Sequence, residues 1–176
     1  MTHNKMRDCI QQIVGKKLNE VLLACEMLRF YFDGDYGIHA VGFVRIIKGS
    51  DILLTTLDYQ NWDEKIDTNN DEWYNLECFK KEIIGGKVVS VKLTKTNDLF
   101  VLLDNDVKIE MYNANGYFHF GEENEQWRFM FGEYDSIVIN NKSIDFFDEK
   151  QIVTLRHGEK KKIVTLRSDQ FKTTDK

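Results

Sequence analysis

Hydrophobic and polar positions alternate along most of this chain, and the period of the alternation changes at glycines. Over residues 5–14 the apolar positions are three and four apart, which predicts a short amphipathic helix that ends at Gly15. The same spacing recurs over residues 73–84, just before Gly85. After each glycine the period becomes two, which is typical of half-buried strands. The sequence therefore predicts two units, each a helix followed by antiparallel strands.

The strands are short and are separated by turn residues. In the first unit the pattern predicts strands over 18–23, 27–32, 37–47 and 52–57. In the second unit, Val89, Val91 and Leu93 alternate with polar residues and are expected on one buried face. The second unit's strands are predicted over 89–93, 99–103, 107–112 and 117–120, followed by strands over 136–139 and 144–147.

The two units also share residues at matched positions. The segment 13–21 matches 83–91 at an offset of 70, and the match resumes one residue later at an offset of 71, where Asp33 corresponds to Asp104. An internal match of this kind is typical of a structural repeat. We therefore expect residues 13–47 and 83–113 to superpose.

These patterns predict an α+β fold, mainly antiparallel β, with two pseudo-repeated helix-plus-β-meander units in one compact body. Two packed sheets and one continuous sheet both fit the pattern. The predicted ranges are a first unit over 1–62, an acidic linker over 63–72, a second unit over 73–148 and a basic C-terminal hairpin or tail over 149–176. In that last range the sequence Ile-Val-Thr-Leu-Arg occurs twice, at 152–156 and 163–167. A hairpin, two helical turns and a partly disordered basic arm are the alternatives there.

Charge is distributed unevenly over a chain of net charge −5. Residues 51–77 hold eight acidic residues and one lysine, a net charge of −7, whereas 149–176 hold eight basic and four acidic residues, a net charge of +4. An acidic body repels nucleic acid and attracts basic partners, although simple solubility is the commoner explanation of such a charge. No apolar run approaches the ~18 residues of a membrane span, and no secretory signal is visible, so a cytoplasmic protein without membrane contact is expected.

Candidate chemistry is sparse. The acidic segment that begins at Asp67 starts like a calcium loop, but Glu72 and Cys78 stand where glycine and a bidentate glutamate are required. The four histidines lie in separate segments, with His39 and His119 on predicted strands. We therefore predict no catalytic residue, no metal and no cofactor. Cys9 and Cys78 are interpreted as reduced thiols on the buried faces of the two helices.

The strongest surface candidate is a cluster of acidic residues beside a tryptophan and an arginine. Trp and Arg are enriched in binding hot spots, and an exposed Trp127 is expected to act as one. In the alternative interpretation, Trp127 and Phe129 point into the core while Arg128 pairs with a neighbouring glutamate. The candidate partner-binding residues are Glu122, Glu123, Glu125, Trp127, Arg128, Asp63 and Glu64.

The second unit, from its Gly-Lys through the strand meander to Glu125-x-Trp-Arg-Phe129, resembles small bacterial proteins of unknown function. Some of these are encoded beside polymorphic or contact-dependent toxins as immunity proteins. The resemblance covers residues 83–131 best, and the first unit departs from it because Asp63-Glu64 follows Trp62. It implies a cytoplasmic toxin-neutralising protein without catalysis.

The function favoured by the sequence is a non-enzymatic protein-binding module, in particular an immunity protein that neutralises a basic toxin domain. The alternative is a small-ligand-binding protein or enzyme with its site in the groove between the two units. A structural subunit of a larger assembly is a third interpretation. The partner is expected to be a basic protein whose association slows as salt rises. The sequence does not set the oligomeric state.

Overall fold

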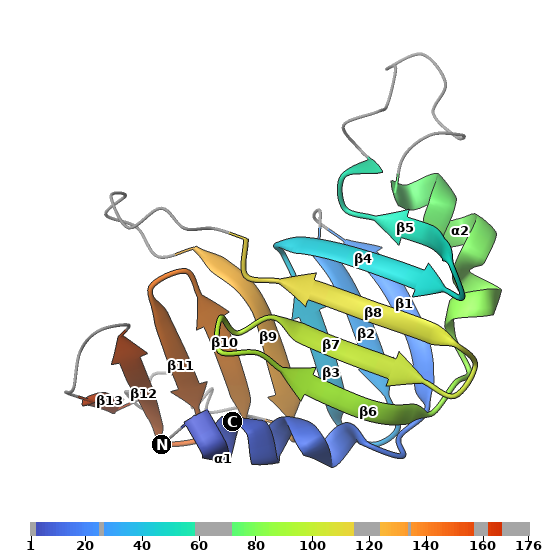
Figure 1. Cartoon of the computed structure of the whole chain (residues 1–176). Helices are drawn as coiled ribbons and strands as arrows, with labels where there is room; N and C mark the ends of the chain where they lie inside the picture. Colours follow the sequence, from blue (N-terminus) through green and yellow to red (C-terminus); the bar gives the residue numbers. More distant parts are fainter. Residues whose placement is uncertain are drawn as a thin grey trace, which may run out of the picture.

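The computed structural model describes residues 3–24, 27–58, 72–114, 124–133, 135–156 and 162–166. Within them the chain forms two short α-helices and thirteen strands (Figure 1). The helical elements are α1 His3–Ile10, the 3-10 turn η1 Gln11–Ile13 and α2 Glu72–Ile83. The strands are β1 Leu18–Ala24, β2 Met27–Phe32, β3 Tyr36–Ala40, β4 Phe43–Lys48, β5 Asp51–Thr55, β6 Val88–Leu93, β7 Leu99–Leu103, β8 Val107–Tyr112, β9 Glu125–Phe131, β10 Ser136–Asn140, β11 Ser143–Phe147, β12 Gln151–Arg156 and β13 Lys162–Leu166.

The strands form two antiparallel sheets. The larger sheet has the order β1-β2-β3-β9-β10-β11-β12-β13, and the smaller sheet has the order β5-β4-β8-β7-β6. The prediction of a mainly antiparallel α+β protein is confirmed, and two sheets rather than one continuous sheet are found. Neither described helix has the length and apolarity that crossing a membrane requires.

The chain passes from one sheet to the other twice. After β3 it leaves the larger sheet, and β4 pairs with β8 in the smaller sheet. After β8 the chain returns, and β9 pairs with β3 in the larger sheet. Each sheet therefore combines strands from the predicted ranges 1–62 and 73–148, so these ranges do not form separate bodies.

The prediction of one long strand over 37–47 is wrong, because the first of these crossings divides it. The backbone N–H groups of Val41 and Gly42 both donate to the carbonyl oxygen of Gln126, at 2.9 and 2.8 Å, which turns the chain out of the larger sheet. Side chains before and after the turn, Ile38 and Val44 among them, are fully buried. The alternation that predicted one strand continues across the crossing because both sheets face the same core.

That core is one cluster between the inner faces of the sheets. Its largest fully buried side chains include Trp127, Phe30 and Phe129. The helices close the sides of the sandwich: α2 contacts β5 and β1, and η1, which continues α1, contacts β6 (Figure 1). Met6, Ile10 and Ile13 add the apolar stripe predicted for the first helix to this core.

The first strand after each helix contains a β-bulge, at Leu18/Glu20 in β1 and at Val88/Ser90 in β6. A bulge adds one residue and shifts the alternation of side chains by one position. Val88 and Val91 are therefore buried, while Val89 is 53% exposed. The prediction that Val89 shares the buried face with Val91 is wrong for this reason.

Replacing Val91 with alanine is expected to lower the free energy of unfolding by about 1–3 kcal/mol, because buried methyl groups are lost and a small cavity remains. The matched control is Val89→Ala, two residues earlier in the chain. It removes the same atoms from an exposed side chain and is expected to change stability by less than ~0.5 kcal/mol. Urea unfolding of both variants measures the difference. Equal effects would show that the bulge does not place Val91 in the core.

The two sheets meet at a corner formed by the residues just before β1 and β6. Lys17 and Lys87 form an isolated antiparallel bridge there. Each lysine N–H also donates to an aspartate carboxylate from the turn after the next strand, Lys17 to Asp33 at 3.1 Å and Lys87 to Asp104 at 2.8 Å. The two aspartates thus hold equivalent positions at the corner.

Candidate functional site

Three nitrogen-bearing side chains lie in one row across the outer face of the larger sheet. The strand register places Arg29 of β2 opposite His39 of β3, and His39 opposite Arg128 of β9. Successive side chains of a strand point to opposite faces. Because the adjacent residues Phe30 and Phe129 are fully buried in the core, the row points away from it.

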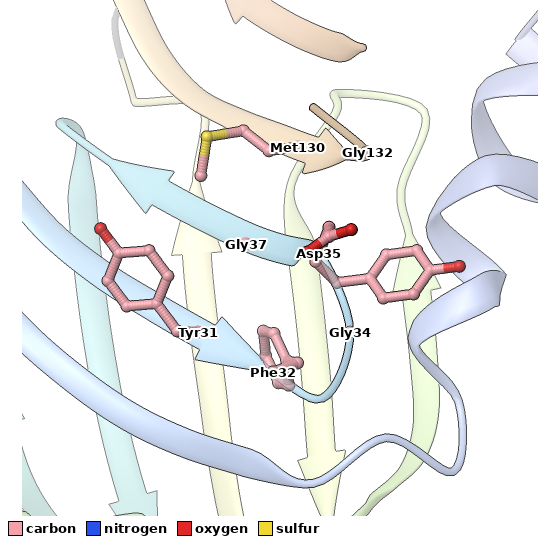
Figure 2. A pocket seen from close by; sticks show the side chains of 8 residues that line it. Tyr31, Phe32, Gly34, Asp35, Gly37, Met130 and Gly132 are labelled. Carbon is pink, nitrogen blue, oxygen red and sulfur yellow. The ribbon is translucent and has the colours of Figure 1, made fainter. Parts of the chain in front are cut away.

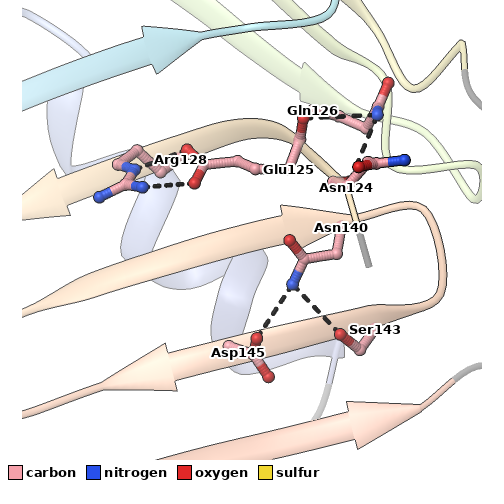
Figure 3. Close-up of polar contacts among 7 residues, drawn as sticks. All are labelled: Asn124, Glu125, Gln126, Arg128, Asn140, Ser143 and Asp145. Atoms are coloured by element: carbon pink, nitrogen blue, oxygen red, sulfur yellow. Dashed lines mark hydrogen bonds and ion pairs between the residues drawn. The ribbon is translucent and has the colours of Figure 1, made fainter. Parts of the chain in front are cut away.

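The members of this row differ in their partners. Arg128 forms an ion pair with Glu125 on its own strand, and its Nε donates to Glu125 Oε1 at 2.6 Å (Figure 3). This hydrogen bond raises the pKa of Arg128. The Nε2 atom of His39 lies 3.3 Å from the hydroxyl of Tyr31. Burial, reinforced by the charges of Arg29 and Arg128, lowers the pKa of His39.

Arg29 is the member of the row that the fold leaves unsatisfied. Its Nε is buried and makes no hydrogen bond, and no ion pair involves Arg29 among the described residues. Arg29 and Arg128 carry like charges on either side of His39, which adds to the energetic cost of holding Arg29 in the row.

A hollow of about 290 Å³ borders this row (Figure 2). It lies two residues further along each strand, where Tyr31, Gly37 and Met130 are opposite one another. Gly37 lies at its floor, between the side chains of Tyr31 and Met130, and the Met130 Cε lies 2.5 Å from where a Cβ on Gly37 would stand. Tyr31 belongs to both features, because its ring lines the hollow and its hydroxyl contacts His39. The full lining is Tyr31, Phe32, Gly34, Asp35, Tyr36, Gly37, Met130 and Gly132.

A group of polar residues lies on the neighbouring strands β10 and β11 (Figure 3). The Asn140 Nδ2 donates to Ser143 Oγ at 3.2 Å and to Asp145 Oδ2 at 2.9 Å. Ser143 is fully buried, and its hydroxyl oxygen accepts this hydrogen bond inside the protein. These hydrogen bonds stabilise the turn between β10 and β11.

A second ionic cluster covers the outer face of the smaller sheet. Glu110 is only 4% exposed and accepts hydrogen bonds from the Arg45 Nε at 2.8 Å and the Tyr112 hydroxyl at 2.8 Å. Lys108 Nζ lies 2.6 Å from its other carboxylate oxygen. Burial raises the pKa of Glu110, but the hydrogen bonds from Lys108, Arg45 and Tyr112 outweigh it and bring the pKa to about 2. This carboxylate is fully satisfied, so we assign the cluster a structural role.

The sequence-predicted site residues separate into three groups. Arg128 and Glu125 lie on the outer face of the larger sheet and pair with each other. Trp127, which stands between them in the sequence, faces the core, is fully buried and donates from Nε1 to the Asn97 carbonyl oxygen at 2.8 Å, so it is not an exposed hot spot. The alternative, in which Trp127 and Phe129 face the core, is the arrangement found. The remaining candidates, Glu122, Glu123, Asp63 and Glu64, lie outside the described residues.

Sequence reasoning missed Arg29 and treated His39 only as a strand histidine. The sequence does contain a local signal that Arg29 and His39 point outward, because each stands between apolar residues that are buried. The register that places β3 beside β9 carried no such signal. His119, the other histidine on a predicted strand, lies outside the described residues.

The described residues contain no group of three or more His, Cys, Asp or Glu side chains that could hold a metal ion. Cys9 is buried, and burial raises the pKa of its thiol. Cys78 is exposed, so its predicted place in the core is wrong; it lies on the outer side of α2. What the outer face of the larger sheet offers chemically is a hydrogen-bonding and ionic surface centred on Arg29.

Comparisons of the chain with known protein families, with curated proteins and with solved structures found no match. The resemblance of residues 83–131 to immunity proteins stays a prediction.

Proposed function

We propose that this chain is a non-enzymatic protein-binding module whose partner docks on the outer face of the larger sheet, over β2, β3 and β9. The observation that carries the proposal is Arg29, whose buried Nε lacks a hydrogen-bond partner among the described residues. An unsatisfied buried donor costs about 1–3 kcal/mol, which a carboxylate from a partner would offset. Arginine binds carboxylates through two parallel hydrogen bonds, so the contact is also specific in geometry.

The surroundings of Arg29 support a protein partner. Tyr31 and Met130 flank the adjacent hollow, and Arg, Tyr and Met are residue types enriched at protein interfaces. The hollow gives a partner side chain a place to insert beside the charged row. A docked surface would also remove water from the row, which strengthens its hydrogen bonds.

An immunity protein that neutralises a basic toxin domain is the specific form of this function that we propose, with a cytoplasmic location. The net charge of −5 would steer a basic protein toward the chain, while an acidic group of that protein meets Arg29. Overall charge governs the rate of encounter, and the local contact governs the lifetime of the complex. Raising salt is therefore expected to slow association.

Substituting Arg29 with glutamine is expected to weaken partner binding about tenfold or more, because the partner's carboxylate loses its charged donor. The matched control is Arg7→Gln, which removes the same charge from an exposed position on α1, away from the row. Tagged wild type would capture its partner from native cells. The affinities of the purified partner for wild type and both variants would then be compared.

Equal weakening by Arg29→Gln and Arg7→Gln would overturn docking at the row, because loss of either positive charge alone should favour encounter with a basic partner. An affinity unchanged by Arg29→Gln would also overturn it.

A small-ligand-binding protein is the second candidate function, and the hollow favours it. Its lining combines Tyr31 and Gly37 from the predicted first unit with Met130 and Gly132 from the second. Its volume of about 290 Å³ lies just below the 300–1,000 Å³ range of ligand sites, so only a small ligand would fit. A small carboxylic acid that raises the melting temperature of wild type but not of Arg29→Gln would favour this function over protein binding.

We also propose that residues 13–47 and 83–113 are two copies of one structural unit. Gly15 and Gly85 both adopt positive φ, 82° and 95°, at the end of the helical segment. Asp33 and Asp104 both bind the lysine N–H that precedes the first strand. These matched details support a repeat. The strand that follows the third strand of each copy, β4 or β9, pairs with the third strand of the other copy, β8 or β3.

A further inference from the structure

The last strand of the larger sheet, β13, is an edge strand within the described part of the chain. β13 pairs with β12, and no described strand lies on its other side. Ile163 is 42% exposed and Val164 is 48% exposed. An edge strand with exposed apolar side chains and unpaired backbone groups is a template for another strand. This edge belongs to neither surface considered above.

The hairpin that forms this edge is self-complementary. β12 and β13 each contain the sequence Ile-Val-Thr-Leu, and they pair antiparallel with Val153 opposite Val164. On either side of that pair an isoleucine faces a threonine, since Ile152 is opposite Thr165 and Thr154 is opposite Ile163. The chain thus already shows this sequence paired with a copy of itself about a central valine pair.

We propose that β13 of one molecule pairs antiparallel with β13 of a second copy of this chain, with Val164 opposite Val164. This register places Ile163 of each copy opposite Thr165 of the other, which repeats the side-chain pairs between β12 and β13. The contact uses the same patch on both copies, as a twofold dimer requires. It joins the two eight-stranded sheets into one continuous sheet.

The backbone geometry of β13 permits this pairing. In an antiparallel strand, alternate residues direct their N–H and C=O groups to opposite neighbours. The bonds to β12 therefore leave every second residue of β13 with its backbone groups directed to the free edge. Val164 shares a face with Val153, which is 6% exposed, so a second Val164 would extend an apolar surface that already exists.

The charges near β13 make the salt dependence of this dimer diagnostic. Lysines at 160–162 and an arginine at 167 flank the paired residues in the sequence, so two copies bring like charges together. Salt screens this repulsion and is expected to strengthen self-association. An acidic strand from another protein at the same edge would bind more weakly as salt rises. The direction of the salt effect therefore distinguishes a second copy of this chain from an acidic partner.

Disulfide trapping tests the register. In a background with Cys25→Ser and Cys78→Ser, the variant Val164→Cys is expected to form a covalent dimer on mild oxidation, because directly opposite Cβ atoms lie about 4.5–5.5 Å apart. Ile163→Cys and Thr165→Cys are the matched controls. Each alone is expected to give little dimer, whereas a mixture of the two is expected to give the crossed dimer.

Sedimentation of the intact chain at low and high salt tests the interaction without cysteines. Wild type is expected to dimerise more strongly at high salt, and Val164→Lys is expected to weaken dimerisation about tenfold or more, because it places two like charges opposite each other. Circular dichroism checks that each variant is folded. A monomer at all concentrations and salts, dimers indifferent to Val164→Lys, or equal trapping at all three cysteine positions would overturn the proposal.

Discussion

Replacing Trp127 with alanine is expected to lower the free energy of unfolding by about 3–5 kcal/mol, the range for large aromatic side chains removed from a core. Trp127 is fully buried on β9, a central strand of the larger sheet. Its Nε1–H also donates to the Asn97 carbonyl oxygen at 2.8 Å, so truncation leaves a buried acceptor without its donor. Urea unfolding followed by circular dichroism measures the loss.

Two further variants separate the contributions to this effect. Trp127→Phe keeps most of the ring volume but removes the donor, and we expect a smaller cost of about 1–2 kcal/mol. Arg128→Ala, at the next position, breaks a partly exposed ion pair and is expected to cost less than ~1 kcal/mol. A Trp127→Ala variant as stable as Arg128→Ala would contradict the buried position of the indole.

The stability of the protein is expected to fall steeply between pH 4.5 and about 2 because Glu110 must become protonated. Its pKa in the folded chain is about 2, against an ordinary value of 4.5. The folded state therefore binds this proton less tightly than the unfolded state. The resulting stabilisation is fully present above pH 4.5 and is lost as pH falls through the folded pKa. A shift of this size corresponds to roughly 3 kcal/mol at neutral pH.

The variant Glu110→Gln removes the titrating group, so its stability at neutral pH should be lower and its decline on acidification shallower. Asp33, whose pKa is lowered by hydrogen bonds from Asn19 and Lys17, keeps some acid dependence in the variant. Glu82→Gln is the control, because the ion pair of Glu82 with Lys48 is exposed on both sides. Unfolding free energies measured from pH 7 to pH 2 with identical slopes for wild type and Glu110→Gln would contradict the role of this cluster.

Most individual strands were predictable because their signals are local. Alternating burial and turn residues delimit strands such as β2 and β7 within one residue, and both helices follow from their apolar stripes. The prediction for 37–47 failed because a strand that changes sheets keeps its apolar alternation. The prediction for Val89 failed because a one-residue bulge leaves no mark in the pattern of apolar residues.

The candidate site was only partly predictable. Arg128 and Glu125 were found from their residue types beside Trp127, although that tryptophan serves the core. Arg29 joins Arg128 only through the pairing of β3 with β9, and this pairing depends on the tertiary structure of the whole chain. A single sequence shows which side of a strand a residue faces, but it does not show which distant strand lies beside it.

The passage of the chain between sheets also affects how this protein can be made. While the ribosome has released only β1 to β5, β3 lacks β9 and β4 lacks β8, so both strands present unpaired edges. Pairing over such long separations must first overcome the entropy of closing large loops, which slows folding. The nascent first half therefore has no complete core of its own and must stay unaggregated until the strands of the second half emerge.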